Sequence, residues 1–279
     1  MSQKLEDESL ENLKGTRTSL TKPKGAASEG TSAAARSASV LYALADEPAG
    51  ISVRSLAEAT GTSRSAAHRI LQSLAEDGYA LQSAEGHYAV GPKLFQLASR
   101  VFAGSTIIGI ADSIMHRLVD EVGETVYLAM LVPQEQYGTF VHRVECSKAI
   151  RFVQPLGGRL PLHAGAVGKA MLAAQAEIDL SNLELPAYTS HTLSTPAHLK
   201  AELEATTKRG FAVSVEERVE GAAGVAAAIS TRWGVIGALT ITIPVNRIPA
   251  DGLESIGPKV RKSADEISEV LAATGTLRF

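Results

Sequence analysis

The sequence has few of the residues on which disulfide-bonded, metal-binding and membrane proteins depend. Cys146 is the only cysteine in 279 residues, so no disulfide can form within the chain and no cysteine cluster can hold a metal. No stretch approaches the ~20 consecutive apolar residues that span a bilayer. The N-terminal segment "MSQKLEDESLENLKG" has no apolar run typical of a secretory signal. We therefore expect a cytoplasmic protein without membrane contacts.

A strong net charge is also absent. The 27 Lys and Arg residues nearly balance the 30 Asp and Glu residues, which gives a formal charge of -3. Any contact with nucleic acid must therefore come from a local basic patch. With 45% hydrophobic and 20% charged residues the composition is that of a globular protein, and 279 residues suffice for one large or two smaller domains.

Local patterns divide the chain into four parts. Residues 1–33 are polar and lack a periodic apolar face, which predicts a disordered tail. Residues 14–36 carry five cations and one acid, a local +4, so the tail is either a solvated segment or an arm that adds phosphate contacts. Residues 34–93 predict helix, helix, turn, helix and hairpin, and residues 94–118 a linker helix, either continuous or broken near Gly104. Residues 119–279 alternate strands and helices, with a strand expected at "AIRFVQ", so the fold class is α+β.

The segment "SRSAAHRILQSLAEDGYAL", residues 63–81, combines a helical apolar face with a cationic front end. The preceding helix ends near Gly61, a residue that tolerates the left-handed turn of a helix-turn-helix. A hairpin with Gly86 in its turn follows, in the position of a wing. This order predicts a winged helix-turn-helix whose second helix enters the major groove of double-stranded DNA.

The predicted DNA contacts are short hydroxyl residues and cations near the start of that helix. Arginine suits bidentate contact with guanine, and a helix N-terminus favours phosphate. The other interpretation is a helical bundle with a solvated cationic face. The predicted DNA-binding residues are Thr62, Ser63, Arg64, Ser65, His68, Arg69 and Lys93.

At this point the sequence resembles the IclR-type bacterial transcriptional regulators. "LADEPAGISVRSLAEATGTSRSAAHRILQSLAEDGY" is similar to their winged helix-turn-helix, and "GGRLPLHAGAVGKAMLA" to their effector-domain signature. "RGFAVSVEERVEGAAGVAAAIS" and "GALTITIP" complete a resemblance over about residues 36–272. It implies a GAF-like C-terminal domain with a small-molecule pocket, N-terminal domains that pair on DNA, and a homodimer or tetramer.

The resemblance also implies where the effector lies. Thr240 and Thr242 alternate with Ile241, so both hydroxyls face one side of a strand, either into an apolar pocket or toward solvent. Carried over residue by residue, the effector-binding positions are Phe152, Leu160, Ala166, Val167, Ser214, Gly224, Thr240 and Thr242.

Three positions depart from the family pattern. Small-acid-binding relatives often carry Asp in place of Ser214 and Cys in place of Gly224, and family members tend to have Pro in place of Ala228. The added volume and the lost acid predict an effector bulkier or more apolar than a two-carbon acid. We expect an aromatic or other carboxylic acid from a degradation pathway.

Enzyme signatures are weak. "GAVGKA" lacks the first glycine and the final Ser/Thr of a phosphate-binding loop, so we reject that site. His163 has no nucleophile and acid that the sequence places beside it, which favours a buried, hydrogen-bonded histidine over a general base. Cys146 has no resolving partner for redox sensing, and His116, His142, His191 and His198 lack metal-ligand spacing. We expect no enzyme activity, cofactor or metal.

The sequence thus predicts a ligand-responsive transcriptional regulator, a repressor or an activator, of a catabolic or metabolic operon. A dimer would read a palindromic operator, and the effector would act through the linker helix at 94–118. The alternative is a small-molecule sensor or enzyme that uses the winged domain for protein interaction.

Overall fold

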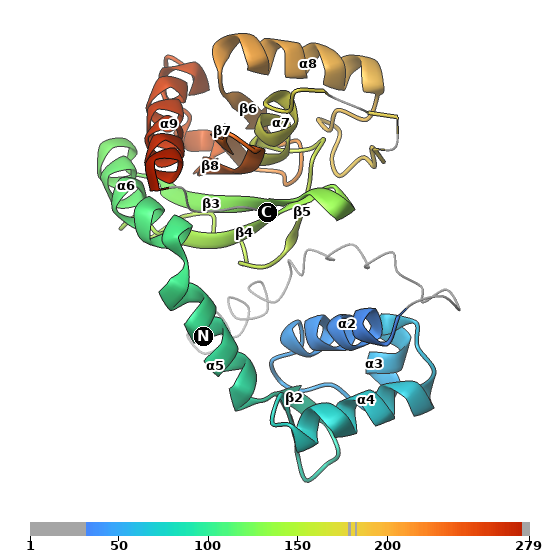
Figure 1. The fold of residues 1–279 in the computed structure, drawn as a ribbon. Coiled ribbons are helices and arrows are strands. Elements are labelled where there is room, and N and C mark those ends of the chain that lie inside the picture. The colour runs from blue at the N-terminus through green and yellow to red at the C-terminus, as the bar shows by residue number, and fades with distance from the viewer. Residues whose placement is uncertain (1–31, 178–179, 182, 275–279) are drawn as a thin grey trace, which may run out of the picture. The chain divides into compact units, whose positions relative to one another are not determined.

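The computed structural model describes residues 32–177, 180–181 and 183–274, and it divides into two compact units between Gly104 and Ser105 (Figure 1). The predicted tail at 1–33 lies outside the described residues, apart from its last two positions. There Ser32 caps the first described helix, since its hydroxyl accepts the Ala35 N–H at 3.2 Å. The helical region therefore begins at Ala33.

The first unit has the predicted order of elements. Its elements are α2 (Ala33–Ala45), α3 (Val53–Thr60), α4 (Arg64–Glu76), β1 (Ala80–Gln82), β2 (Tyr88–Val90) and α5 (Pro92–Gly104). Strands β1 and β2 form the antiparallel hairpin, and Ile51 pairs with Tyr88 as a short third strand.

A small core fixes α4 against the rest of this unit. Val40, Leu44, Leu56, Ala67 and Leu71 are fully buried and come from α2, α3 and α4. Between α3 and α4, Gly61 adopts φ +65°, a left-handed conformation that a β-carbon would strain. The apolar half of α4 thus faces this core, which leaves its other half available for contacts.

The linker predicted over 94–118 is two helices, and they break next to Gly104, where the sequence left a break open. Helix α5 ends at Gly104, and α6 (Thr106–Val122) starts afresh, with Ser105 in an extended conformation as its N-cap. The Ser105 hydroxyl accepts the Ile108 N–H at 3.5 Å, and α6 packs its apolar face into the second unit. Within the described residues no single helix is long and apolar enough to cross a membrane; only α5 and α6 counted together, across their break, reach that length.

The second unit is built on one six-stranded antiparallel sheet. Its strands are β3 (Thr125–Val132), β4 (Tyr137–Val144), β5 (Arg159–Pro161), β6 (Ala212–Val215), β7 (Ala222–Thr231) and β8 (Gly234–Pro244). Their spatial order is β5-β4-β3-β8-β7-β6. The long central strands β3, β7 and β8 carry most of the core, because alternate residues on each strand face opposite sides.

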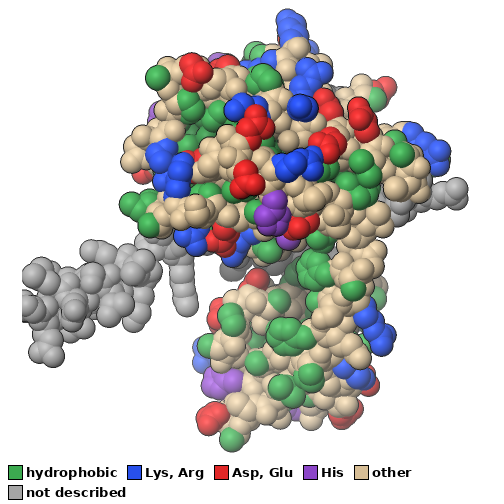
Figure 2. Space-filling view, turned by 90° about the vertical axis from the view of Figure 1, so that its left-hand side faces the viewer, with side chains coloured by type: hydrophobic (Ala, Val, Ile, Leu, Met, Phe, Trp, Pro, Cys, Tyr) green, Lys and Arg blue, Asp and Glu red, His purple; other side chains and the backbone are tan. Residues whose placement is uncertain are grey.

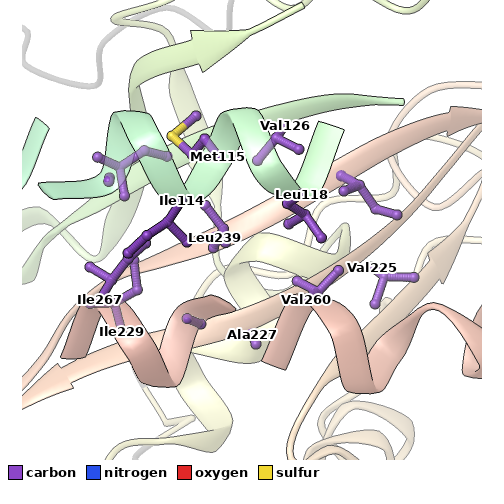
Figure 3. Close-up of a cluster of buried hydrophobic side chains, with 14 of the residues drawn as sticks. Ile114, Met115, Leu118, Val126, Val225, Ala227, Ile229, Leu239, Val260 and Ile267 are labelled. Carbon is purple, nitrogen blue, oxygen red and sulfur yellow. The ribbon is translucent and has the colours of Figure 1, made fainter. Parts of the chain in front are cut away.

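Helices cover both faces of this sheet (Figure 1). Helices α6 and α9 (Gly257–Thr274) pack on one face against Val126, Val225 and Leu239, as the close-up of this core shows (Figure 3). Helices α7 (Ala166–Ala173) and α8 (Pro196–Arg209) lie over the other face. The mixed layers agree with the predicted α+β class.

One predicted strand is absent. The segment "AIRFVQ" was expected to extend as a strand, but residues 149–155 have no strand in the structure. Side chains bind its backbone in place of a neighbouring strand: the Tyr127 hydroxyl donates to the Phe152 carbonyl at 3.2 Å and accepts the Gln154 N–H at 2.8 Å. Arg143 also donates to the Gln154 carbonyl at 3.1 Å. The segment is therefore an irregular but anchored loop.

Candidate DNA-binding surface and ligand cavity

The front end of α4 presents its polar residues to solvent. Ser63 is the N-cap, and its hydroxyl accepts the Ala66 N–H at 3.2 Å. Arg64, Ser65, His68 and Arg69 are all exposed, while Ala67 between them is fully buried. The buried side anchors the helix, so the polar side forms a surface that a ligand can approach.

The two arginines of α4 carry uncompensated charge. Within the described part of the chain neither Arg64 nor Arg69 forms an ion pair, whereas Arg54 on α3 contacts Glu58 at 3.0 Å. An unpaired guanidinium can donate to phosphate or to a base edge without first breaking an internal contact. The start of α4 is therefore the candidate DNA-binding surface.

The remaining predicted DNA contacts lie beside α4. The Thr62 hydroxyl is 2.9 Å from that of Thr60, so it already has one partner. Exposed Lys93, at the start of α5, holds its Nζ 5.4 Å from the Tyr79 ring centroid. The wing also carries an acid that sequence reasoning overlooked: Glu85 stands beside Gly86 in the turn, and a hydrogen bond from Ser83 lowers the pKa of its carboxyl. The wing tip is thus less cationic than α4.

A cavity of about 70 Å³ lies between the start of α7 and strands β6, β7 and β8. Seven of the eight predicted effector-binding positions line it, and Phe152 does not; its ring instead approaches Gly221. The seven lining positions are Leu160, Ala166, Val167, Ser214, Gly224, Thr240 and Thr242.

The polar wall of the cavity is one row across three strands. Ser214 on β6 pairs with Gly224 on β7, and Gly224 pairs in turn with Thr242 on β8. Because Gly224 has no side chain, it leaves space between the two hydroxyl residues. Thr240 is buried and already donates to the Val225 carbonyl at 2.8 Å, so its oxygen retains only acceptor capacity.

A buried ion pair lies next to the cavity, outside its lining. Lys169 is 1% exposed, and its ammonium donates to the Val213 carbonyl at 2.6 Å and to the Glu217 carboxylate. The second oxygen of Glu217 accepts the Gly165 N–H at 3.0 Å. Sequence reasoning placed Lys169 in a packing motif without a charged role. The pair joins the start of α7 to the loop after β6.

Arg218 and Gln154 also line the cavity, and sequence reasoning missed both. The guanidinium of Arg218 donates to Gln154 Oε1 at 2.8 Å. Burial lowers the pKa of Arg218 from its usual value, although the nearby Tyr188 and Tyr127 hydroxyls oppose that effect. In the sequence Arg218 follows two acids, which is typical of a solvated charged segment, so nothing pointed to a cavity.

His163 lies outside the cavity as a buried, hydrogen-bonded side chain. Its Nε2 is 2.9 Å from the Pro186 carbonyl, and its ring stacks on Tyr188 with centroids 5.7 Å apart. Burial lowers the pKa of its imidazole. Cys146 is also buried, with the Thr125 hydroxyl 3.6 Å from its sulfur. Among the described residues no group of three or more His, Cys, Asp or Glu side chains could hold a metal.

Comparison with known proteins identifies a family for both units. The model of the IclR helix-turn-helix domain matches residues 33–84, and that of the bacterial transcriptional regulator IclR C-terminal domain matches residues 99–269. The transcriptional repressor IclR of Escherichia coli K12 is 33% identical over 239 residues, which cover 84% of this chain and 87% of the relative. The acetate operon repressor of Salmonella typhimurium LT2 is 34% identical over 247 residues, with 86% and 89% covered.

Solved structures show the same architecture. The Thermotoga maritima IclR crystal structure has a TM-score of 0.66 and 29% identity, and it covers 85% of this chain and 97% of its own. An IclR homolog from Microbacterium hydrocarbonoxydans, crystallised with 4-hydroxybenzoate, has a TM-score of 0.72 and 25% identity, with 87% and 100% covered. The curated relatives are named as repressors and regulators of transcription. The chain therefore belongs to the IclR family of DNA-binding bacterial transcriptional regulators.

Proposed function

We propose that this regulator binds a palindromic operator through the α4 helices of two paired copies. Its affinity for that operator changes when an organic acid binds in the cavity of the second unit. It acts in the cytoplasm on a catabolic or metabolic operon. The observation that carries the DNA-binding half is the exposed, unpaired Arg64 and Arg69 at the capped start of α4. Ser65 and His68 on the same surface add hydrogen-bonding groups for phosphate or base edges.

Helix α5 supports pairing of copies. None of its residues is buried, although several are large and apolar. The exposed apolar side chains, each more than half exposed, are Phe95, Leu97, Val101 and Phe102. Figure 2 looks toward the side on which α5 lies and shows hydrophobic side chains at the surface of the first unit. A contiguous apolar face of this kind favours a protein interface, and a second copy would supply the two-fold symmetry that a palindrome requires. This face supports the proposed homodimer, or a tetramer made of two dimers.

The cavity favours a compact acid. At about 70 Å³ it has about half the volume of the ~150 Å³ engineered cavity that holds benzene. A carboxylic acid with a few carbon atoms fits this space, whereas an aromatic acid such as the 4-hydroxybenzoate found with the Microbacterium relative requires lining side chains to move. We therefore propose a small carboxylic acid as effector and revise the expected preference for a bulky one.

The test is binding of the full chain to the DNA upstream of its own gene. A shift that competitor DNA of unrelated sequence does not abolish, and that a carboxylic acid alters, supports the proposal. Footprinting on the same fragment should protect two half-sites related by two-fold symmetry. Absence of any sequence-specific shift would favour the alternative, a small-molecule sensor or enzyme that uses the winged unit for protein interaction.

A further inference from the structure

We infer that Arg218 binds the carboxylate of the effector and that Gln154 positions its guanidinium for this contact. The inference rests on the proposed sensing of an organic acid and assigns the charged group that recognises it. A resemblance-based assignment of the site contains hydroxyl, glycine and apolar positions but no cation. Arg218 adds a permanent positive charge, because the guanidinium stays protonated in proteins.

Among the described residues that line the cavity, Arg218 is the only Lys, Arg, Asp or Glu. The described part of the chain gives it no carboxylate partner, and the amide oxygen of Gln154 is the acceptor that it contacts, at 2.8 Å. A guanidinium has five N–H donors, so the contact with Gln154 leaves donors of the half-buried Arg218 available to a ligand. A bound carboxylate would accept two of them side by side.

The acids next to Arg218 in sequence are engaged elsewhere. Glu217 pairs with Lys169 and accepts the Gly165 N–H. Glu216 accepts the Gly221 N–H at 2.7 Å and lies 3.7 Å from His191. Both carboxylates are thus held away from the arginine that follows them, which leaves its charge available to the cavity.

Gln154 is fixed from its backbone. The Tyr127 hydroxyl accepts its N–H, and Arg143 donates to its carbonyl. With both backbone groups bound, the point from which the amide side chain extends is fixed, and its oxygen accepts from the Arg218 guanidinium. The Gln154 amide is a neutral acceptor, so it orients the guanidinium and leaves its positive charge in place. A carboxylate at this point would neutralise that charge.

Other parts of the lining offer further donors to the same anion. Ala166 and Val167 lie at the start of α7; the Glu217 carboxylate accepts the N–H of the N-cap Gly165, and no side chain accepts the N–H groups of Ala166 and Val167 in the described structure. The free N–H groups and dipole of a helix start favour negative charge. The Ser214 and Thr242 hydroxyls border the same space. Charge, donors and volume together fit a compact monocarboxylate.

The experiment uses the full-length protein and calorimetric titration with acetate, propionate, lactate, benzoate and 4-hydroxybenzoate, each beside its amide. We expect at least one carboxylate to bind and its amide to bind much more weakly. Arg218→Gln should weaken carboxylate binding by about 30-fold or more, since truncating one member of a buried charge pair has an effect of that order. The carboxylate affinity of Arg218→Lys should lie between those of the unaltered protein and Arg218→Gln, because an ammonium keeps the charge but lacks the bidentate geometry. Melting curves without ligand verify that each variant folds.

A second variant separates recognition from packing. Gln154→Glu keeps the shape but places a carboxylate 2.8 Å from Arg218, so it should neutralise the cation and abolish carboxylate binding while the fold becomes no less stable. Equal binding of acid and amide, unchanged binding in both variants, or no binding by any of these acids at millimolar concentration would overturn the inference. Specific DNA binding is measured in parallel, so that loss of the proposed regulatory function is recognised separately from failure of this ligand assignment.

Discussion

The Lys169 ammonium and the Glu217 carboxylate form a buried ion pair that holds the start of α7 against the loop after β6, because Glu217 also accepts the Gly165 N–H at 3.0 Å. Glu202 lies 3.5 Å from the same ammonium but is paired more closely with Arg209, at 2.6 Å. The cavity wall therefore depends on charges that do not themselves touch the cavity.

Lys169→Met should destabilise the second unit by about 3–5 kcal/mol, because it leaves Glu217 buried without its partner. Chemical denaturation of the full chain measures this. Lys259→Met is the matched control, since Lys259 makes an exposed contact with Glu121 at 3.3 Å and should matter by less than about 1 kcal/mol. Equal effects of the two substitutions would show that the buried pair has no special role.

Replacing both Arg64 and Arg69 with Ala should weaken operator binding and flatten its salt dependence. Each arginine that contacts a phosphate contributes about 0.9 to the slope of log K against log salt. Anisotropy titrations at several salt concentrations give that slope. Arg54→Ala removes an exposed arginine that is already paired with Glu58, so it should leave both affinity and slope nearly unchanged. If the double variant bound like the unaltered protein, α4 would not be the reading helix.

Gly224→Ala should reduce effector affinity and also lower stability somewhat, because the neighbouring strand must move slightly to make room. The new β-carbon would lie 3.1 Å from the Ile241 carbonyl oxygen and 3.8 Å from Ala166, inside the cavity, and the backbone there needs no left-handed conformation. Thermal shift with the acids that bind the unaltered chain measures the loss. Gly109→Ala on α6, where nothing lies within 4 Å, is the control and should not alter ligand binding. Unreduced affinity in the Gly224 variant would place the effector elsewhere.

His163 should make stability depend on pH just below neutrality. Burial lowers the pKa of its imidazole below the usual value of 6.5, so the unfolded chain binds a proton more readily than the folded one. Stability should therefore fall as pH decreases from about 6.5 toward the lowered pKa. Melting temperatures at pH 7.5 and 5.5 should differ less for His163→Gln than for the unaltered chain. His198→Gln is the control, because His198 is exposed, and it should not alter the difference in melting temperature between the two pH values. If both substitutions reduced that difference equally, burial of His163 would not be its cause.

Local patterns predicted the winged unit well because short-range chemistry determines it. Ser52 and Ser63 cap α3 and α4, and Gly61 and Gly86 adopt the positive φ that their turns require. The sequence left open whether the linker breaks near Gly104, because an apolar helical pattern continues on both sides of that residue. The break depends on α6 packing into the core of the second unit, a long-range contact that periodicity does not reveal.

The cavity was predictable only in part. Alternation along β8 placed the Thr240 and Thr242 hydroxyls on one side, and the resemblance supplied five further lining positions. Arg218 and Gln154 come from segments 64 residues apart, and both lie in irregular backbone with no period to indicate direction. The predicted position of Phe152 in the cavity lining could not be checked by strand alternation for the same reason. Its loop is held by the Tyr127 hydroxyl and not by a neighbouring strand.

The row formed by Ser214, Gly224 and Thr242 also bears on how such sensors diversify. Its backbone groups belong to the sheet, so the strands persist whichever small side chains occupy the row. A single-codon change there alters the volume or polarity offered to a ligand while the helices that hold the sheet are untouched. Under the proposed function, a change of one small residue in this row would therefore alter which effector binds while the sheet stays folded.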